Sequence, residues 1–173
     1  MSLVVRKVYN KRDFDILKPD NSFLVAGEIQ ADAVTDLKTS ENKLSIYIVP
    51  DDTSIKRVIA ALAASREKFQ HLDYVILSMD DFENIRAKFQ LKVDNKKGKT
   101  ADSVVNGWHK DLIELSNTRI TELARAFIYH GTKSRENWKD VKSLVIKGVE
   151  NHTLDPKLVN QVLMKTITEE HRL

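Results

Sequence analysis

The sequence contains the same pattern twice in succession: an apolar run, two aspartates, and a segment with helical spacing. In chain order the parts are 44–49, Asp51 with Asp52, and 54–69, followed by 74–77, Asp80 with Asp81, and 82–89. Short runs rich in Val, Ile and Tyr predict strands, and apolar residues three and four positions apart predict amphipathic helices. A strand, a helix and a second strand of these lengths predict a right-handed β-α-β crossover with parallel strands.

Two further runs, 3–9 and 22–29, are also rich in residues that favour strands. The connection from 30 to 42 has no long helical pattern, so we expect the strands at 23–29 and 43–49 to be antiparallel. The expected fold class is therefore α/β (α+β), with a small mixed sheet of about four strands that contains the β-α-β crossover.

Beyond Leu91 every apolar pattern has helical spacing, which predicts an α-helical C-terminal half that begins at Asp102 or Ser103. The preceding segment is polar and basic, and such segments are typical of linkers or loops. Three regions follow: an α/β body at 1–91, a basic linker or loop at 92–101, and a helical region at 102–173. We expect the helical region to pack on the body or to form a partner surface.

The 173 residues include no cysteine, which excludes disulfides, thiolate metal sites and cysteine nucleophiles. This absence favours a reducing compartment, and we expect a cytoplasmic protein. No apolar run reaches the ~20 residues needed to cross a bilayer, so no membrane partner is expected. None of the five histidines has another at helical metal-binding spacing, so we predict no metal site or cofactor.

Parallel crossover strands would place both aspartate pairs at strand carboxyl ends, where open α/β sheets bind ligands. The candidate catalytic residues are the carboxylates Asp51, Asp52, Asp80, Asp81 and Glu28. Together they would suit a metal- or phosphate-dependent hydrolase. Helix capping is the favoured alternative, with Asp52 or Ser54 accepting from the first-turn amides of the first helix and Asp80 forming a capping box with Glu83.

Basic charge is concentrated in the second half of the chain. Residues 1–90 contain 13 basic and 14 acidic residues, whereas 91–173 contain 15 and 11. Lys96, Lys97 and Lys99 are candidates for contact with a nucleic acid or a phosphate. The run 97–100 is similar to the end of a nucleotide-binding loop, but Val93 stands where that motif needs glycine. A flexible basic loop accounts better for the segment.

The helical half combines several apolar stripes with no complete catalytic motif. Apolar stripes that stay exposed are typical of partner surfaces. We therefore predict a non-enzymatic regulatory or protein-interaction module that binds a protein partner or associates with itself. The hydrolase and the nucleic-acid-binding protein are the alternatives, and the sequence does not decide whether the chain is an enzyme.

Overall fold

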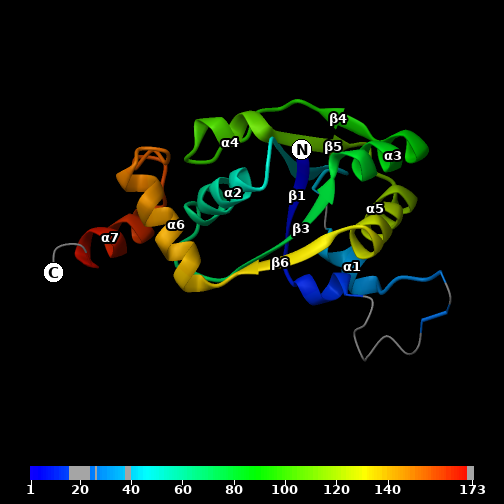
Figure 1. Cartoon of the computed structure of the whole chain (residues 1–173), viewed down its shortest axis with the longest axis horizontal. Helices are drawn as coiled ribbons and strands as arrows, with labels where there is room; N and C mark the ends of the chain where they lie inside the picture. Colours follow the sequence, from blue (N-terminus) through cyan, green and yellow to red (C-terminus); the bar gives the residue numbers. More distant parts are fainter. Residues whose placement is uncertain (16–23, 26, 38–39, 171–173) are drawn as a thin grey trace.

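The computed structural model describes residues 1–15, 24–25, 27–37 and 40–170. A six-stranded sheet forms the centre of the fold, and helices cover both of its faces (Figure 1). The strands are β1 (Leu3–Val8), β2 (Leu44–Val49), β3 (Leu72–Ser78), β4 (Lys92–Asp94), β5 (His109–Ile113) and β6 (Thr132–Glu136). Their order across the sheet is β4-β5-β2-β1-β3-β6, and every pairing between described strands is antiparallel.

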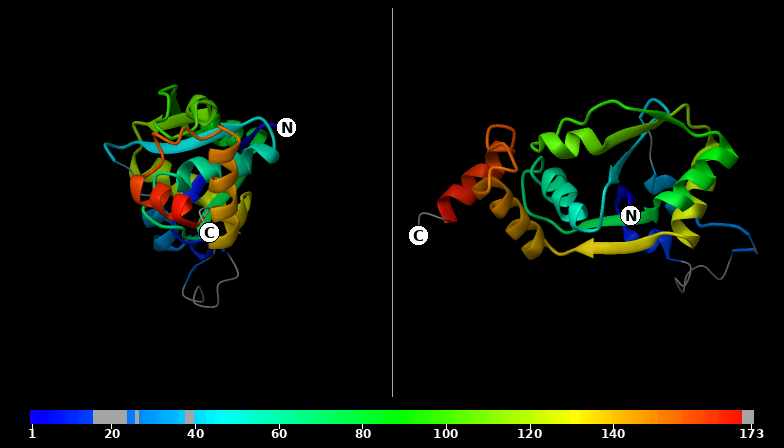
Figure 2. Two further views of the ribbon diagram at one scale, coloured as in Figure 1. Left: turned by 90° about the vertical axis from the view of Figure 1, so that its left-hand side faces the viewer. Right: turned by 45° about the horizontal axis from the view of Figure 1, so that its top comes forward.

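The helices divide into two groups according to the face of the sheet on which their buried side chains pack. The first group, on what we name the α2 face, consists of α2 (Thr53–Ala63), α4 (Ser103–Trp108), α6 (Trp138–Glu150) and α7 (Gln161–Glu170). The second group, on the α5 face, consists of the 3-10 helix η1 (Lys11–Phe14), α1 (Ala31–Asp36), α3 (Met79–Phe89) and α5 (Asn117–Tyr129). In Figure 1 and in the right-hand view of Figure 2, α6 and α7 lie at the opposite end of the molecule from α3 and α5.

Successive apolar side chains of β1 point to opposite faces of the sheet, which explains why there is a hydrophobic core on each face. Val5 packs into the core under α2, whereas its neighbour Val4 packs into the core under α5. Successive side chains of a strand point to opposite faces, so a central strand that is apolar on both sides needs helices on both. Ile59 of α2 and Phe127 of α5 are fully buried on these two sides.

The predicted crossover is present in a modified form. β2 and β3 both run antiparallel to β1, so they run in the same direction and α2 connects them. They do not pair with each other, because β1 lies between them. The predicted mixed sheet of about four strands is therefore wrong in strand number and in pairing. The local pattern predicted each element but carried no signal for the insertion of β1.

The prediction that everything beyond Leu91 is helical is wrong at three places. β4 lies within the predicted linker 92–101, and β5 and β6 lie within the predicted helical region. β5 pairs with β2, and β6 pairs with β3, so both halves of the chain build one sheet. Whether 1–91 and 102–173 act as separate functional regions stays a prediction.

The predicted strand at 22–29 is also wrong where it can be checked. Ser22, Phe23 and Ala26 lie outside the described residues, and the described remainder of this segment contains no strand. The backbone N–H of Glu28 donates to the carbonyl of Val25 at 2.9 Å, which closes a turn. Gly27 has a φ of +89°, a conformation that disfavours side chains and interrupts an extended run.

Candidate functional site

The two aspartate pairs do lie at the same edge of the sheet, but they are not adjacent. Leu3 of β1 pairs with Val49 on one side and with Ser78 on the other. Because neighbouring strands are about 4.8 Å apart, the ends of β2 and β3 are separated by roughly 10 Å. The helices that follow them, α2 and α3, pack into opposite cores. The chain therefore leaves this edge toward different faces after each strand.

Asp51 occupies the position of a helix cap. Its Oδ1 accepts hydrogen bonds from Thr53 Oγ1 (2.7 Å), from the Ser54 N–H (2.9 Å) and from Ser54 Oγ (2.9 Å). The bond from Thr53, followed by those from Ser54, lowers the pKa of Asp51 below its ordinary value. Asp52 is exposed and makes no side-chain capping bond to α2. Capping at this position thus belongs to Asp51, not to Asp52.

The start of α3 has the same kind of arrangement. Ser78 Oγ accepts from the Asp81 N–H (3.0 Å) and donates to Asp81 Oδ2 (2.5 Å). Ser78 therefore caps α3, and Asp81 accepts from the Ser78 hydroxyl, whereas the acidic side chain of a capping box accepts from the backbone N–H of the cap residue. This cap lies two residues before the Asp80 and Glu83 box expected from the sequence, and Glu83 instead pairs with Arg86. Asp80 is exposed.

Glu28 lies in the turn that replaces the predicted strand. Its Oε2 accepts from the Val25 N–H at 2.9 Å, and the residue is exposed. Among the described residues, no three His, Asp or Glu side chains are grouped so that they could hold a metal ion. The five candidate carboxylates are therefore not brought together as one metal cluster.

The basic loop is held in place by backbone contacts. The Lys96 carbonyl lies 2.9 Å from His109 Nδ1, and the Gly98 N–H donates to the Asn106 carbonyl at 2.9 Å. A Cβ at Gly98 would lie 3.0 Å from Asn106 Oδ1, so this close approach favours glycine. The side chains of Lys96, Lys97 and Lys99 are exposed. The loop thus presents three exposed lysines from an anchored backbone.

His109 belongs to a mostly buried polar cluster on β2 and β5. Its Nε2 lies 3.4 Å from Asp111 Oδ1, which also accepts from Ser45 Oγ at 2.8 Å. The ring of Tyr47 meets the His109 ring edge to face, with centroids 5.4 Å apart. Burial raises the pKa of Tyr47 to about 12, so the phenol is neutral near pH 7. The contacts join adjacent strands and the basic loop, which is a structural role.

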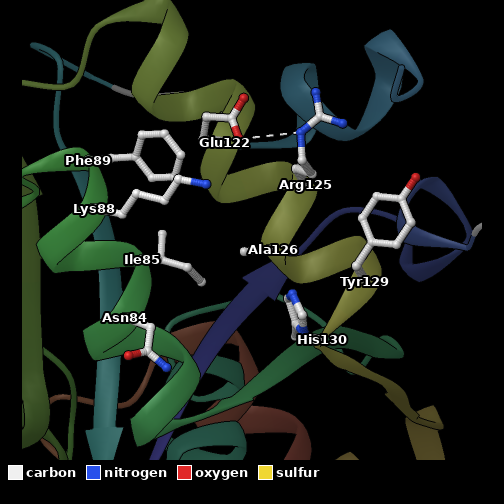
Figure 3. Close-up of a pocket in the computed structure, with 9 residues that line it drawn as sticks. All are labelled: Asn84, Ile85, Lys88, Phe89, Glu122, Arg125, Ala126, Tyr129 and His130. Carbon is white, nitrogen blue, oxygen red and sulfur yellow. Dashed lines mark ion pairs between the residues drawn. The ribbon is translucent and has the colours of Figure 1, made fainter. Parts of the chain in front are cut away.

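An apolar groove lies between α3 and α5 on the α5 face (Figure 3). Its volume is about 260 Å³. The groove is lined by Asn84, Ile85, Lys88, Phe89, Glu122, Arg125, Ala126, Tyr129 and His130. Ile85 and Phe89 are one helical turn apart on α3, and Ala126 and Tyr129 are one turn apart on α5, so each helix contributes an apolar edge. Tyr129 is 50% exposed.

Polar side chains surround this apolar floor. Arg125 Nε lies 3.3 Å from Glu122 Oε2, and Arg125 also donates to the carbonyl of Gly27. Lys88 extends from α3 toward α5 across the groove (Figure 3). Its Nζ lies 5.1 Å from the centroid of the Phe89 ring. These residues are not among the candidates predicted from the sequence, although their spacing of three and four positions was a usable signal.

A larger hollow of about 380 Å³ lies on the α2 face, between α4 and the turn after α6. Ser103, His152 and Asp155 all line it. Among the described residues no hydrogen bond joins these three side chains, and Asp155 Oδ1 instead accepts from the Lys157 N–H at 2.9 Å. A serine nucleophile needs a base within hydrogen-bond reach, so this arrangement does not activate Ser103.

No protein-family model, curated protein or solved structure matches this chain. Within the part of the chain that the structure describes, no helix combines the length and apolar character needed to cross a membrane.

Proposed function

We propose that this protein is a non-enzymatic interaction module that holds an apolar side chain of a protein partner in the α3–α5 groove. The observation that carries the proposal is the groove itself: an apolar floor between two helices with a polar rim and a half-exposed tyrosine. Interfaces with this composition concentrate their binding energy in a few buried anchors, and tyrosine is enriched among them.

The size of the groove favours a side chain over a small-molecule ligand. Pockets for small molecules and cofactors usually enclose about 300–1,000 Å³ and bury most of the ligand. The α3–α5 groove, with about 260 Å³, lies below that range. Grooves between helices commonly accept apolar side chains from a partner segment.

The surface that supports this proposal is not the set of apolar stripes from which the sequence predicted an interaction module. Most residues of the apolar stripes predicted from the sequence are buried in the two cores, including Leu123 and Phe127 of α5 and Val145 of α6. The groove uses a neighbouring strip of α5, with the buried Ala126 and the half-exposed Tyr129, and is not lined by Leu123 or Phe127. An interaction surface is thus supported by a different set of residues.

The two alternatives have weaker support. The hydrolase proposal depends on the strand-end carboxylates, of which Asp51 caps α2 and Asp81 accepts from the Ser78 hydroxyl at the start of α3. The nucleic-acid proposal depends on Lys96, Lys97 and Lys99, which are exposed on an anchored loop. The nucleic-acid proposal would be supported if the protein binds an oligonucleotide at ~50 mM salt and the affinity falls steeply as salt is added.

Tyr129 and Trp138 offer a matched pair for the test. Tyr129 lines the groove and is 50% exposed, whereas Trp138 lies on α6 and is 51% exposed. Peptides of 12 residues would be selected on the wild-type protein from a displayed random library, and their affinity measured by fluorescence polarisation. We expect Tyr129→Ala to weaken binding about 10-fold or more, in keeping with the loss of a hot-spot tyrosine. We expect Trp138→Ala to change binding less than about 2-fold on the same scale.

Two results would overturn the proposal. One is a library that yields no peptide with measurable affinity for the wild-type protein. The other is a set of selected peptides that bind Tyr129→Ala as tightly as wild type. Circular dichroism of each variant establishes that the fold is retained, which is expected because the substituted side chains are half exposed.

A further inference from the structure

We infer that the partner segment is acidic, with a carboxylate close to the apolar side chain that enters the α3–α5 groove. This inference rests on the proposed function and adds the chemical class of the partner. It is carried by the distribution of charge around the groove, where one cation is already neutralised and another is not.

The first cation, Arg125, is satisfied within the chain. Its Nε lies 3.3 Å from Glu122 Oε2, and it donates a further hydrogen bond to the Gly27 carbonyl. The side chains of Arg125 and Glu122 are 32% and 24% exposed, so the pair forms a partly buried wall of the groove. This wall has no net charge to offer a partner.

The second cation, Lys88, is different. It is exposed on α3, and it forms no ion pair with any residue that the structure describes. The position of its ammonium near the Phe89 ring, 5.1 Å from the centroid, holds the charge beside the apolar floor. A partner that covers Phe89 and Ile85 would therefore also cover Lys88.

Covering Lys88 makes the sign of the partner's charge important. A carboxylate brought beside the ammonium replaces lost water contacts, and the attraction strengthens as water is excluded. A lysine or arginine at the same place would meet Lys88 with no compensating acid, because Glu122 is already paired with Arg125. Like charges at an interface are a recognised means of excluding wrong partners.

The other polar groups that line the groove are compatible with the same partner. Tyr129 and His130 lie on the α5 side, and Asn84 lies on the α3 side (Figure 3). A phenol hydroxyl and an amide NH₂ group can both donate hydrogen bonds to carboxylate oxygens. An apolar anchor flanked by aspartate or glutamate thus finds donors on both helices.

The test uses three displayed peptide libraries that share a randomised apolar anchor and differ only in the fixed residues beside it. One library carries Asp and Glu, one carries Asn and Gln, and one carries Lys and Arg. We expect enrichment on the wild-type protein from the acidic library, with affinity that falls as NaCl is raised from about 50 to 500 mM because screening shortens the range of the attraction.

Lys88 and Lys139 provide the matched charge variants. Both are exposed lysines beside an aromatic ring, Phe89 on α3 and Trp138 on α6, at 5.1 and 5.8 Å from the ring centroids. We expect Lys88→Glu to weaken the acidic peptides about 10-fold and to favour the basic library, and Lys139→Glu to change binding less than about 2-fold.

The outcomes separate this inference from the proposed function. Equal affinity for all three libraries, together with loss of binding in Tyr129→Ala, would overturn the acidic partner and leave the groove as the binding site. An equal effect of Lys88→Glu and Lys139→Glu would also overturn it. Binding that is indifferent to Tyr129→Ala would overturn the groove itself, and the acidic partner with it.

Discussion

Each face of the sheet contains a fully buried aspartate bound by an arginine, and the two pairs hold different kinds of structure together. On the α2 face, Asp102 is paired with Arg57; on the α5 face, Asp73 is paired with Arg135. Both carboxylates are 0% exposed, and the arginines are 35% and 38% exposed. The burial and the type of partner are therefore matched, so any difference in their importance comes from what each pair connects.

Asp102 connects α4 to α2, two helices that are not joined by strand-like backbone pairing. One of its oxygens, Oδ1, accepts from Arg57 Nη2 (3.0 Å) and from the N–H groups of Val104 (2.8 Å) and Val105 (3.2 Å). It thus caps α4 and fixes α4 to α2. Asp73 instead connects β3 to β6, whose backbones are already paired, and accepts from the Lys11 N–H at 2.9 Å. The Asp102–Arg57 pair joins two helices that have no backbone pairing, whereas the Asp73–Arg135 pair adds to the backbone pairing of β3 with β6.

The largest effect is therefore expected from Asp102→Asn. The substitution leaves Arg57 without its carboxylate and weakens the cap of α4, while keeping the size of the side chain. Removal of one partner of a buried ion pair typically costs 3–5 kcal/mol, and the partial exposure of Arg57 places the expected loss near the lower end, at about 3 kcal/mol. The measurement is the free energy of unfolding from urea titration.

Asp155→Asn is a suitable control for Asp102→Asn. Asp155 is exposed, lines the same region of the α2 face, and accepts one local bond from the Lys157 N–H. We expect a change within about 0.5 kcal/mol, as for most surface substitutions. Equal losses for Asp102→Asn and Asp155→Asn would show that the Arg57 pair does not hold α4 in place.

The sequence predicted a helix that begins at Asp102 or Ser103 but gave no sign that Asp102 is buried. Its partner Arg57 is 45 positions away, and Asp73 and Arg135 are 62 apart, so neither pair leaves a local pattern. The strands also differ in how clearly their composition predicts them. β1, β2 and β3 are rich in Val, Ile and Tyr and were recognised, whereas the edge strand β6 reads Thr-Lys-Ser-Arg-Glu and has no apolar residue. An edge strand tolerates such composition because one side of it faces no further strand.

β5 was missed for a different reason. Leu112 and Leu115 continue the three- and four-residue spacing of Val105 and Trp108, so the pattern predicted one long helix. The helix ends at Trp108, and Leu112 faces the α5 core while Val105 faces the α2 core. The apolar positions thus serve two separate cores. Periodicity alone could not distinguish this arrangement from a single buried stripe.

Asp73→Asn is expected to have the second largest effect and to depend on pH. Burial opposes the ionisation of Asp73, but hydrogen bonds from Arg135 and from the Lys11 N–H outweigh burial, so its pKa is lowered. Stability from such a group is present above the ordinary aspartate pKa of about 3.9 and is lost as the pH falls through the lower folded value. We expect Asp73→Asn to cost about 2 kcal/mol at pH 7, less than Asp102→Asn because β3 and β6 stay paired.

The pH dependence provides its own check. Unfolding free energies of wild type and Asp73→Asn would be measured from pH 7 to pH 2. The gap between them is expected to be constant near neutrality and to shrink below about pH 4, as the wild-type carboxylate becomes protonated. A gap that does not change with pH would show that the ionised carboxylate does not stabilise the fold. A loss equal to that of Asp102→Asn would remove the difference between the two faces.

The smallest effects are expected from the exposed aspartates at the sheet edge, which also separate capping from catalysis. Asp51 accepts three bonds at the start of α2, whereas Asp52 makes no side-chain capping bond there. We expect Asp51→Ala to lower the urea midpoint slightly, by less than either buried aspartate, and Asp52→Ala to leave it unchanged. Titration calorimetry with Mg²⁺ or Mn²⁺ is expected to show no binding heat in the wild type. A wild-type binding heat that disappears in Asp51→Ala or in Asp52→Ala would instead favour the hydrolase, because one or two carboxylates commonly hold such a cation.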